Sequence, residues 1–559
     1  MRVILVLLAL RLAAVRKIVK DREGAKIAVM GAFALIFALV SVGMYQILLW
    51  VFGAITRELG AAGPALTLYI LETSLVLVWL LALMSYLVSG LWIFFHASDT
   101  SLLLSTPLSL TTLYWLRVTE TFTLTLWAFV VLGVPALLAL GASYGSDARY
   151  YLHALGVLVL FVAFTGGTGA IGTTLAGVAF RRFRIRTATL VLSLVLLGGF
   201  ALLIGRDLIP SRGDFEAIFQ PGILNGKPGS IKFIEAKFGL WPSHPFAVTF
   251  YTSATGQAAG TATSRAALWL GPLLVLTTAL FPGRWLYRRT LPLAAEGFVL
   301  AGGGENAPPT RQRQFPRLFS GPVGSLLERD LLRLGRSPRE LGHAGFLLFL
   351  LALYTAFLFA APLREVGANP EAVAWLSLLN VAAAGYFLTA FGLRFVFPSL
   401  SLEGRAAWVL FASPVRIFRL FIAKLVLYAV LLFLVVGGIA LAGTLRLSPP
   451  PSLFVALAIL LVLVTATTVA VSLAFGTTWP NFTQSKPESL ATSAGGLATT
   501  FVCLGYVALA GWLAQRMTLA VLNGQSPWGP LLVGLGVSSV IVASVVAAAR
   551  RKIQRLEVV

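Results

Sequence analysis

Charged side chains that could do chemistry gather in one stretch of the second half, residues 397–424. It carries both signs of charge: Glu403, Arg405, Arg416, Arg419 and Lys424. The same stretch holds a bulky apolar run at 408–411. Its charges oppose crossing a bilayer, and an apolar stripe beside charge is typical of a helix lying at a membrane surface or docked on another protein. We interpret it as a surface segment on which a partner protein pushes.

A weaker copy of this stretch occupies residues 96–117. Asp99 is a plausible helix start, and Pro107 ends the helix because proline lacks the backbone N–H that a helix interior needs. Ten residues beyond Pro107 stands Arg117, and Lys424 follows Pro414 by the same interval. The two segments supply the candidate docking residues: Asp99, Pro107, Leu108, Arg117, Glu403, Gly404, Arg405, Pro414, Val415, Arg416 and Lys424.

Motifs for catalysis, cofactors or metals are missing from the sequence. It contains no G-x-x-x-x-G-K-[ST] phosphate loop and no H-E-x-x-H zinc pattern. Its single cysteine, Cys503, cannot form an internal disulfide, and its four histidines are scattered. We expect the histidines to be solvated or interfacial. The sequence thus predicts no catalytic, cofactor or metal site, and no ATPase of its own.

Composition indicates an integral membrane protein. Hydrophobic residues make up 58% of the 559 residues and charged residues 11%, whereas soluble domains carry about 25% charged residues. A membrane helix needs about 20 apolar residues, and strands of a transmembrane barrel are nearer 10. Long continuous runs therefore predict an all-α polytopic protein, and twelve spans fit the sequence best.

Polar positions within the expected spans have ordinary explanations. Glu72 lies near the outer end of the second span, where it can reach the interface; the alternative is a residue lining a pathway. Arg117 and Glu120 are spaced to form an ion pair on one helix face. The glycine-rich run 165–177 resembles a nucleotide loop, but no strand precedes it and no lysine follows. We expect it to pack helices closely.

Basic residues alternate between loops, as the positive-inside rule requires. They cluster at 2–26, 181–186, 284–339, 394–424 and 550–555. This topology accounts for the net charge of +22 without nucleic acid, and places both termini in the cytoplasm. Lipid contact by the long basic loop is also compatible with it.

The domain plan has four parts. Residues 1–26 form an interfacial lead-in helix, and 27–290 a first six-helix half with an external loop at 205–265. A cytoplasmic linker covers 291–320, and a second six-helix half covers 321–559.

Two short motifs recur in the same order in both halves. Residues 105–108 (STPL) fall on 412–415 (ASPV), and 177–183 (GVAFRRF) fall on 476–482 (GTTWPNF). This pattern favours a duplication. Six spans per half keep both halves in one orientation, so the repeat would be parallel, with a pseudo-two-fold axis along the membrane normal.

Three stretches together resemble the membrane subunits of ABC-type-two exporter permeases, in their fused double-length form. They are ERDLLRLGRSPREL, FPSLSLEGRAAWVLFASPVRIFRLFIAK and FGTTWPNF with the following KPESLATSAGG. The resemblance implies that segments 96–117 and 397–424 are coupling helices. It also implies a partner ATP-binding subunit, in two copies, that holds ATP and Mg²⁺. Transport would run between the two halves, in a prokaryotic inner membrane, among membrane lipids.

Two other classes remain open from the residues alone. A secondary active transporter of twelve helices shares the parallel repeat, but the loop after the second span lacks the G-x-x-x-D-R-x-G-R pattern of the major facilitator class. A lipid-modifying membrane enzyme would need clustered His, Asp or Glu at one membrane face, and the sequence shows none. The transported substrate is not encoded in any motif.

Overall fold

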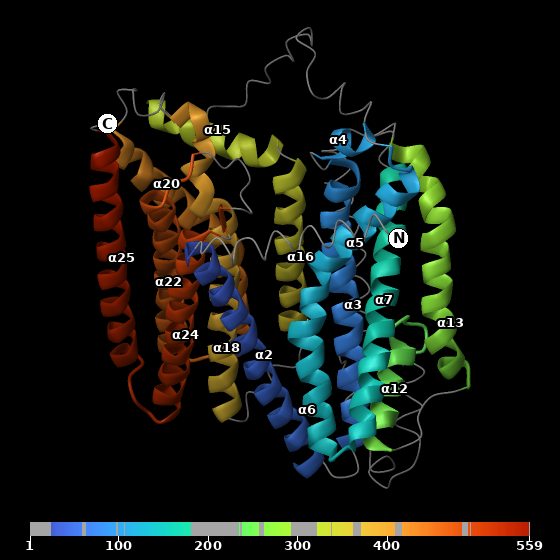
Figure 1. Cartoon of the computed structure of the whole chain (residues 1–559). Coiled ribbons are helices and arrows are strands. Elements are labelled where there is room, and N and C mark those ends of the chain that lie inside the picture. The colour runs from blue at the N-terminus through green and yellow to red at the C-terminus, as the bar shows by residue number, and fades with distance from the viewer. Residues whose placement is uncertain are drawn as a thin grey trace. The chain divides into compact units, whose positions relative to one another are not determined.

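Helices form every described element of the computed structural model (Figure 1). The described residues are 24–58, 63–96, 99–179, 234, 237–256, 262–291, 321–360, 370–407, 416–482 and 490–557, with single-residue gaps at 106, 337 and 492. Most of the predicted lead-in 1–26 and most of the linker 291–320 lie outside them. A helical fold throughout the described residues follows from the long apolar runs, because a helix satisfies every backbone polar group within its own segment.

The chain divides into two units, Met1–Arg311 and Gln312–Val559. Across the described residues, eight helices are long and apolar enough to cross a membrane, which is compatible with a membrane protein. Twelve spans were expected, and the expected fifth span, which ends near 204, falls outside the described residues.

Unit 1 is an all-helical bundle in its described part. Its elements are α2 (Gly24–Glu58), α3 (Gly63–His96), α4 (Thr100–Leu104), α5 (Leu110–Ala128), the π-helix η2 (Phe129–Gly133), α6 (Val134–Tyr144), α7 (Ala148–Ala179), α12 (His244–Thr255), α13 (Ala262–Thr278) and the π-helix η5 (Ala279–Gly283).

Glycines of α7 let this helix lie directly against its neighbours in unit 1. A Cβ at Gly169 would overlap the ring of Tyr86 on α3, and one at Gly166 would stand 2.5 Å from Phe122 on α5. Neither position has room for a side chain. The prediction that the glycine-rich run is a packing surface is therefore confirmed.

Unit 2 begins with a surface helix and continues with long apolar helices. Its elements are α15 (Gly321–Arg336), α16 (Pro338–Ala360), α18 (Pro370–Phe391), the π-helix η6 (Gly392–Val396), the 3₁₀-helices η7 (Phe397–Ser399) and η8 (Ser401–Ala406), α20 (Ile417–Leu432), the π-helix η9 (Phe433–Gly437), α21 (Gly438–Arg446), α22 (Pro451–Thr478), α24 (Ala494–Leu522) and α25 (Trp528–Glu557).

The start of the stretch 397–424 is buried rather than exposed at a surface. Phe397 is 2% exposed and Ser401 2% exposed, and η7 packs on α22. A Cβ at Gly476 would overlap the carbonyl group of Phe397, so only glycine permits this crossing. The expectation of one continuous surface segment is wrong for these residues, because the helix carrying them continues into the packed core of unit 2.

Each unit interrupts a long helix with a five-residue π-helix of similar sequence. In unit 1, η2 reads FVVLG and joins α5 to α6; in unit 2, η9 reads FLVVG and joins α20 to α21. A π-helix holds one extra residue per turn and recurs at functional positions. In each unit it follows, within the same run of helix, the buried cation described next.

Candidate functional site

A buried arginine in the first half of α5 gathers two acidic side chains. Arg117 is 1% exposed. Its Nη2 donates to Asp99 Oδ1 at 2.8 Å and to Thr100 Oγ1 at 2.9 Å, while Nη1 donates to Glu120 Oε2 at 2.7 Å. We call Arg117, Asp99, Thr100 and Glu120 the Arg117 cluster. The predicted pairing of Arg117 with Glu120 is confirmed.

The Arg117 cluster fastens the preceding segment to α5. Asp99 stands just before α4, and α4 ends at Leu104 ahead of Pro107. Burial lowers the pKa of Arg117, but hydrogen bonds and charge from Asp99 and Glu120 outweigh burial and hold that pKa above its usual value. The arginine is therefore a permanent cation that two carboxylates share.

A buried lysine holds the corresponding place in unit 2. Lys424, on α20, is 3% exposed, and its Nζ lies 2.8 Å from Oδ2 of Asp330 on α15. Asp330 Oδ1 accepts a hydrogen bond at 3.1 Å from Arg329, and Arg329 also pairs with Glu403. We call Lys424, Asp330, Arg329 and Glu403 the Lys424 cluster.

The Lys424 cluster ties three elements together by alternating charge. α15 supplies Asp330 and Arg329, α20 supplies Lys424, and η8 supplies Glu403. Burial lowers the pKa of Arg329, but the charge of Glu403 and the contacts with Asp330 outweigh burial and raise it. An alternating row leaves no buried charge without an opposite neighbour, which is the condition for tolerating charges away from water.

Apolar contacts hold α15 in place beside these ion pairs. Leu327 of α15 is 6% exposed and packs with Leu400 and Leu420. One face of α15 is thus leucine-rich, while the adjoining residues Arg329 and Asp330 carry the charges. This amphipathic pattern explains why the helix lies on the unit and does not insert among the long apolar helices.

The structure brings only some of the predicted docking residues together. Arg117 meets Asp99, and Lys424 joins Glu403 through the α15 pair. Gly404 marks a kink with φ 55° and ψ −136°, a conformation that favours glycine. Of the remaining candidates, three are partly or fully exposed without joining either cluster: Pro107, Leu108 and Arg416. Three others lie outside what the structure describes of the side chains: Arg405, Pro414 and Val415.

Two members of the Lys424 cluster were missing from the predicted set, namely Arg329 and Asp330. Their signal was present as the neighbouring opposite charges of E-R-D in a helix that is otherwise basic. An acidic residue on a basic helix indicates a specific cation elsewhere, but the sequence does not show which one. Lys424 lies about a hundred residues further along the chain.

A buried carboxylate–imidazole contact lies between α3 and α12 of unit 1. Glu72 is fully buried, and its Oε1 lies 2.6 Å from Nδ1 of His244, which is 6% exposed. The expectation that Glu72 reaches the interface, and that His244 is solvated, is wrong. α12 closes over this position because its apolar residues Phe246 and Phe250 are buried against the unit.

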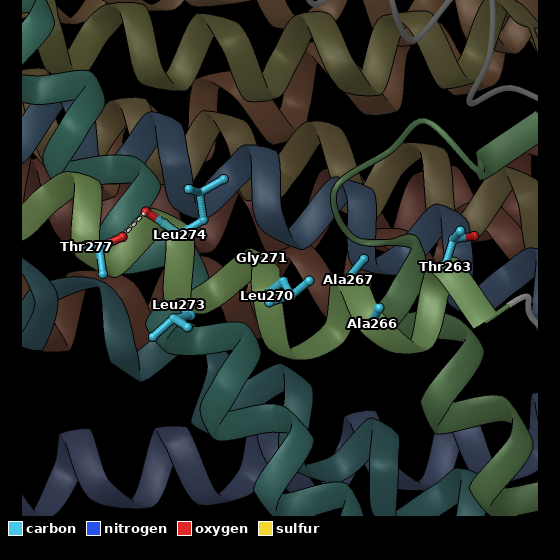
Figure 2. Close-up of a pocket in the computed structure, with 8 residues that line it drawn as sticks. All are labelled: Thr263, Ala266, Ala267, Leu270, Gly271, Leu273, Leu274 and Thr277. Atoms are coloured by element: carbon cyan, nitrogen blue, oxygen red, sulfur yellow. Dashed lines mark hydrogen bonds between the residues drawn. The ribbon is translucent and has the colours of Figure 1, made fainter.

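The groove drawn in Figure 2 carries no titratable side chain among its lining residues. It has a volume of about 640 Å³ and follows one helix, α13. Leu270, Leu273 and Leu274 line it and are 60–69% exposed. The hydroxyl of Thr277 donates a hydrogen bond to the carbonyl oxygen of Leu274 at 2.9 Å. The groove can contact apolar matter, but it cannot carry out acid–base chemistry or bind phosphate.

The described part of the chain offers no metal site, because it holds no group of three His, Cys, Asp or Glu side chains that could bind an ion. Cys503 is buried in α24.

The fold and the two clusters define a helical, membrane-type protein with a buried ion-paired cation in each of its two units. A sequence profile described as "Putative ATP-binding cassette" matches residues 21–543, so the chain belongs to that family. No curated protein and no solved structure matches the chain.

Family membership corrects three expectations from the sequence. The chain was expected to be an exporter permease, to have no ATPase function, and to leave ATP and Mg²⁺ to a partner subunit. The matching family is described by ATP binding and covers nearly the whole chain, so these expectations are overturned. ATP and Mg²⁺ thereby become ligands that the family implies for this chain.

The described residues do not fit ATP. Phosphate cradles use a glycine-rich loop between a strand and a helix, but the described elements are all helices. The space beside the glycine-rich run of α7 is filled by Tyr86, Phe122 and Val275, the last of which would stand 2.6 Å from a Cβ at Gly167. We therefore place no ATP site among the described residues and derive no step of ATP binding or hydrolysis there.

Proposed function

We propose that the chain is a membrane-spanning member of the ATP-binding cassette family that works in transport, and that its two clusters pass movement of the segments before each cluster on to the long helices. The observation that carries this proposal is the shared position of two buried cations. Arg117 and Lys424 each lie in the first half of a helix that leads to a π-helix, and each is held by a carboxylate outside that helix, Asp99 or Asp330.

An ion pair between two elements couples a displacement of one element to the other. A force on α15 would reach α20 through Asp330 and Lys424, and α20 leads into η9. A force on α4 would reach α5 through Asp99 and Arg117, and α5 leads into η2. Because π-helices recur at functional positions in helices, we assign η2 and η9 as the positions at which these two helical runs bend.

A parallel repeat of two six-span halves accounts for these likenesses, and we propose it as the layout. The FVVLG and FLVVG π-helices support it. So does a second pair of contacts: Gly177 of α7 abuts Phe95 at the end of α3, and Gly476 of α22 abuts Phe397 at the end of the α18–η6 run.

The proposed orientation places both clusters and both termini in the cytoplasm of a prokaryotic cell. The positive-inside distribution supports it, because α15 and the end of α25 carry the basic residues of unit 2. The partly or fully exposed residues Pro107, Leu108 and Arg416 would then belong to the surface that receives the push. α12, within the loop 205–265, would cap unit 1 on the outer side.

The test uses cysteine labelling, for which the single native cysteine is first removed. Cys503 is replaced by serine, and one new cysteine is placed at Leu102, which is 68% exposed on α4, or at Arg416 at the start of α20. Purified protein in liposomes is then labelled with a membrane-impermeant maleimide, with and without MgATP. We expect MgATP to change the labelling rate at both positions, and ATP hydrolysis is measured in the same sample.

Controls make the outcome specific. A cysteine at Leu522, exposed at the far end of α24, reports on the opposite end of unit 2 and should respond less. Lys424→Met should abolish the response at position 416 and leave that at position 102 intact. Labelling rates that MgATP leaves unchanged at both positions would refute the proposal.

A further inference from the structure

Five arginines at one end of unit 2 have no acidic partner in the part of the chain that the structure describes. They are all exposed: Arg416, Arg419, Arg550, Arg551 and Arg555. Lys424, on the same helix as Arg419, is by contrast buried and paired. Unpaired positive charge gathered at one end of a helical unit attracts an anion from outside the chain.

These arginines lie on two helices, α20 and α25, that are in contact. The guanidinium of Arg550, near the end of α25, lies 5.5 Å from the ring centroid of Phe418 on α20. Phe418 stacks on Phe421 with centroids 6.0 Å apart and planes 9° apart. Figure 1 shows this end of α25, marked C, at the same end of unit 2 as α15.

Apolar surface runs directly away from the arginines along both helices. On α25, Val540 and Val533 are 70% and 53% exposed, and their helical spacing puts them on the same face as Arg551. On α20, Val426 and Val430 are each 54% exposed. Of the apolar stretch within the span Ile417–Arg446 only 28% is buried, and of that within Trp528–Arg555 only 22%.

We infer that this end of unit 2 binds an anionic phospholipid. The arginines and the Arg550–Phe418 contact receive the phosphate of the headgroup, and the exposed valines receive the acyl chains. A soluble acidic protein would match the charges but leave the adjoining apolar faces uncovered, so the surface favours a lipid. The inference does not depend on the proposed transport function.

Native mass spectrometry of the purified full chain in detergent tests the inference. The probes are dioleoylphosphatidylglycerol, which is anionic, and dioleoylphosphatidylcholine, which has no net charge. We expect the anionic lipid to bind at least tenfold more tightly. Arg550→Gln and Arg551→Gln should each weaken its binding about fivefold, as loss of one surface cation implies, while Arg550→Lys should retain most of it.

Arg516 offers a matched control. It is exposed and lies 5.3 Å from the ring of Trp512, but it precedes the turn from α24 to α25, so it sits toward the opposite end of the unit. Arg516→Gln should leave anionic-lipid binding unchanged. Circular dichroism melting identifies any variant that fails to fold, and the fully folded Arg550→Gln and Arg551→Gln singles carry the conclusion.

Three results would overturn the inference. Equal affinity for the two lipids would remove the charge recognition, and an equal loss in Arg516→Gln would remove the location. Displacement of the lipid by glycerol 3-phosphate or by an acidic peptide at equal concentration would show that the acyl chains contribute nothing.

Discussion

The Arg117 cluster and the Lys424 cluster both stabilise a buried cation, but with opposite ratios of cations to carboxylates. In unit 1 one cation is shared by two carboxylates, Asp99 and Glu120. In unit 2 one carboxylate, Asp330, stands between two cations, Lys424 and Arg329. The first arrangement is redundant for its buried cation, whereas the second makes Asp330 indispensable to Lys424.

The clusters also differ in how far apart their residues lie in the sequence. Asp99, Arg117 and Glu120 lie within one short stretch of sequence, so the Arg117 cluster can form when α4 and α5 form. The Lys424 cluster needs α15, η8 and α20 to assemble first. In unit 2 the ion pairs therefore hold the surface helix α15 in place, and any displacement of α15 would break them.

The largest expected contrast between the units concerns two glycines. Gly476→Ala would drive a Cβ into the backbone of Phe397, which cannot move aside, whereas Gly177→Ala would meet only the ring tip of Phe95. We expect Gly476→Ala to cost about 3 kcal/mol or more and Gly177→Ala about 1 kcal/mol. Free energies of unfolding from SDS titration followed by circular dichroism measure both. Equal costs would contradict the difference between the two crossings.

The next contrast removes one carboxylate from each cluster. Asp330→Asn removes the opposite charge from buried Lys424, whose other polar contact among the described residues is the carbonyl of Ser399 at 3.5 Å, so we expect a loss of about 3 kcal/mol. Glu120→Gln leaves Arg117 its bonds to Asp99 and Thr100, and should cost about 1 kcal/mol. The same SDS titration measures both variants. A Glu120→Gln loss as large as that of Asp330→Asn would show that the Arg117 cluster is not redundant.

Replacing the buried cation, alone or together with Asp330, should cost less than removing the charge of Asp330 alone. Lys424→Met leaves Asp330 paired with Arg329, and the double variant Asp330→Leu with Lys424→Met replaces both buried charges by apolar groups. We expect each to lose only about 1 kcal/mol, since apolar replacements of a buried pair are often neutral. A double-mutant cycle with Asp330→Leu alone measures the coupling. Additive losses would mean that the two side chains act independently.

The smallest expected effect on stability comes from the π-helices. Deleting Val131 from η2 or Val435 from η9 removes the extra residue, and each run can then close as ordinary α-helix. We expect the unfolding free energy to change by less than about 1 kcal/mol, while the MgATP-dependent change in cysteine labelling is lost in the unit that carries the deletion. Unchanged labelling in both variants would remove the π-helices from the mechanism.

The sequence by itself determined the features that depend on local pattern. Long apolar runs required helices, because a helix satisfies its backbone polar groups within one segment and the runs are too long and continuous for strands of a barrel. Arg117 and Glu120 were paired by their three-residue spacing, and the glycines of α7 were assigned to packing because they lack the flanking strand and lysine of a nucleotide loop. These inferences hold because each needs only neighbours within a few turns.

Only the tertiary structure decided the features that join distant segments. The contact of Asp330 with Lys424, the burial of Glu72 against His244, and the approach of Phe397 to Gly476 each depend on which helices pack together, and helical periodicity does not specify packing partners. For the same reason the sequence made residues 397–424 a single surface segment, although its first turns are buried. Charge pattern shows that a side chain needs a partner, and the packing of helices chooses which one.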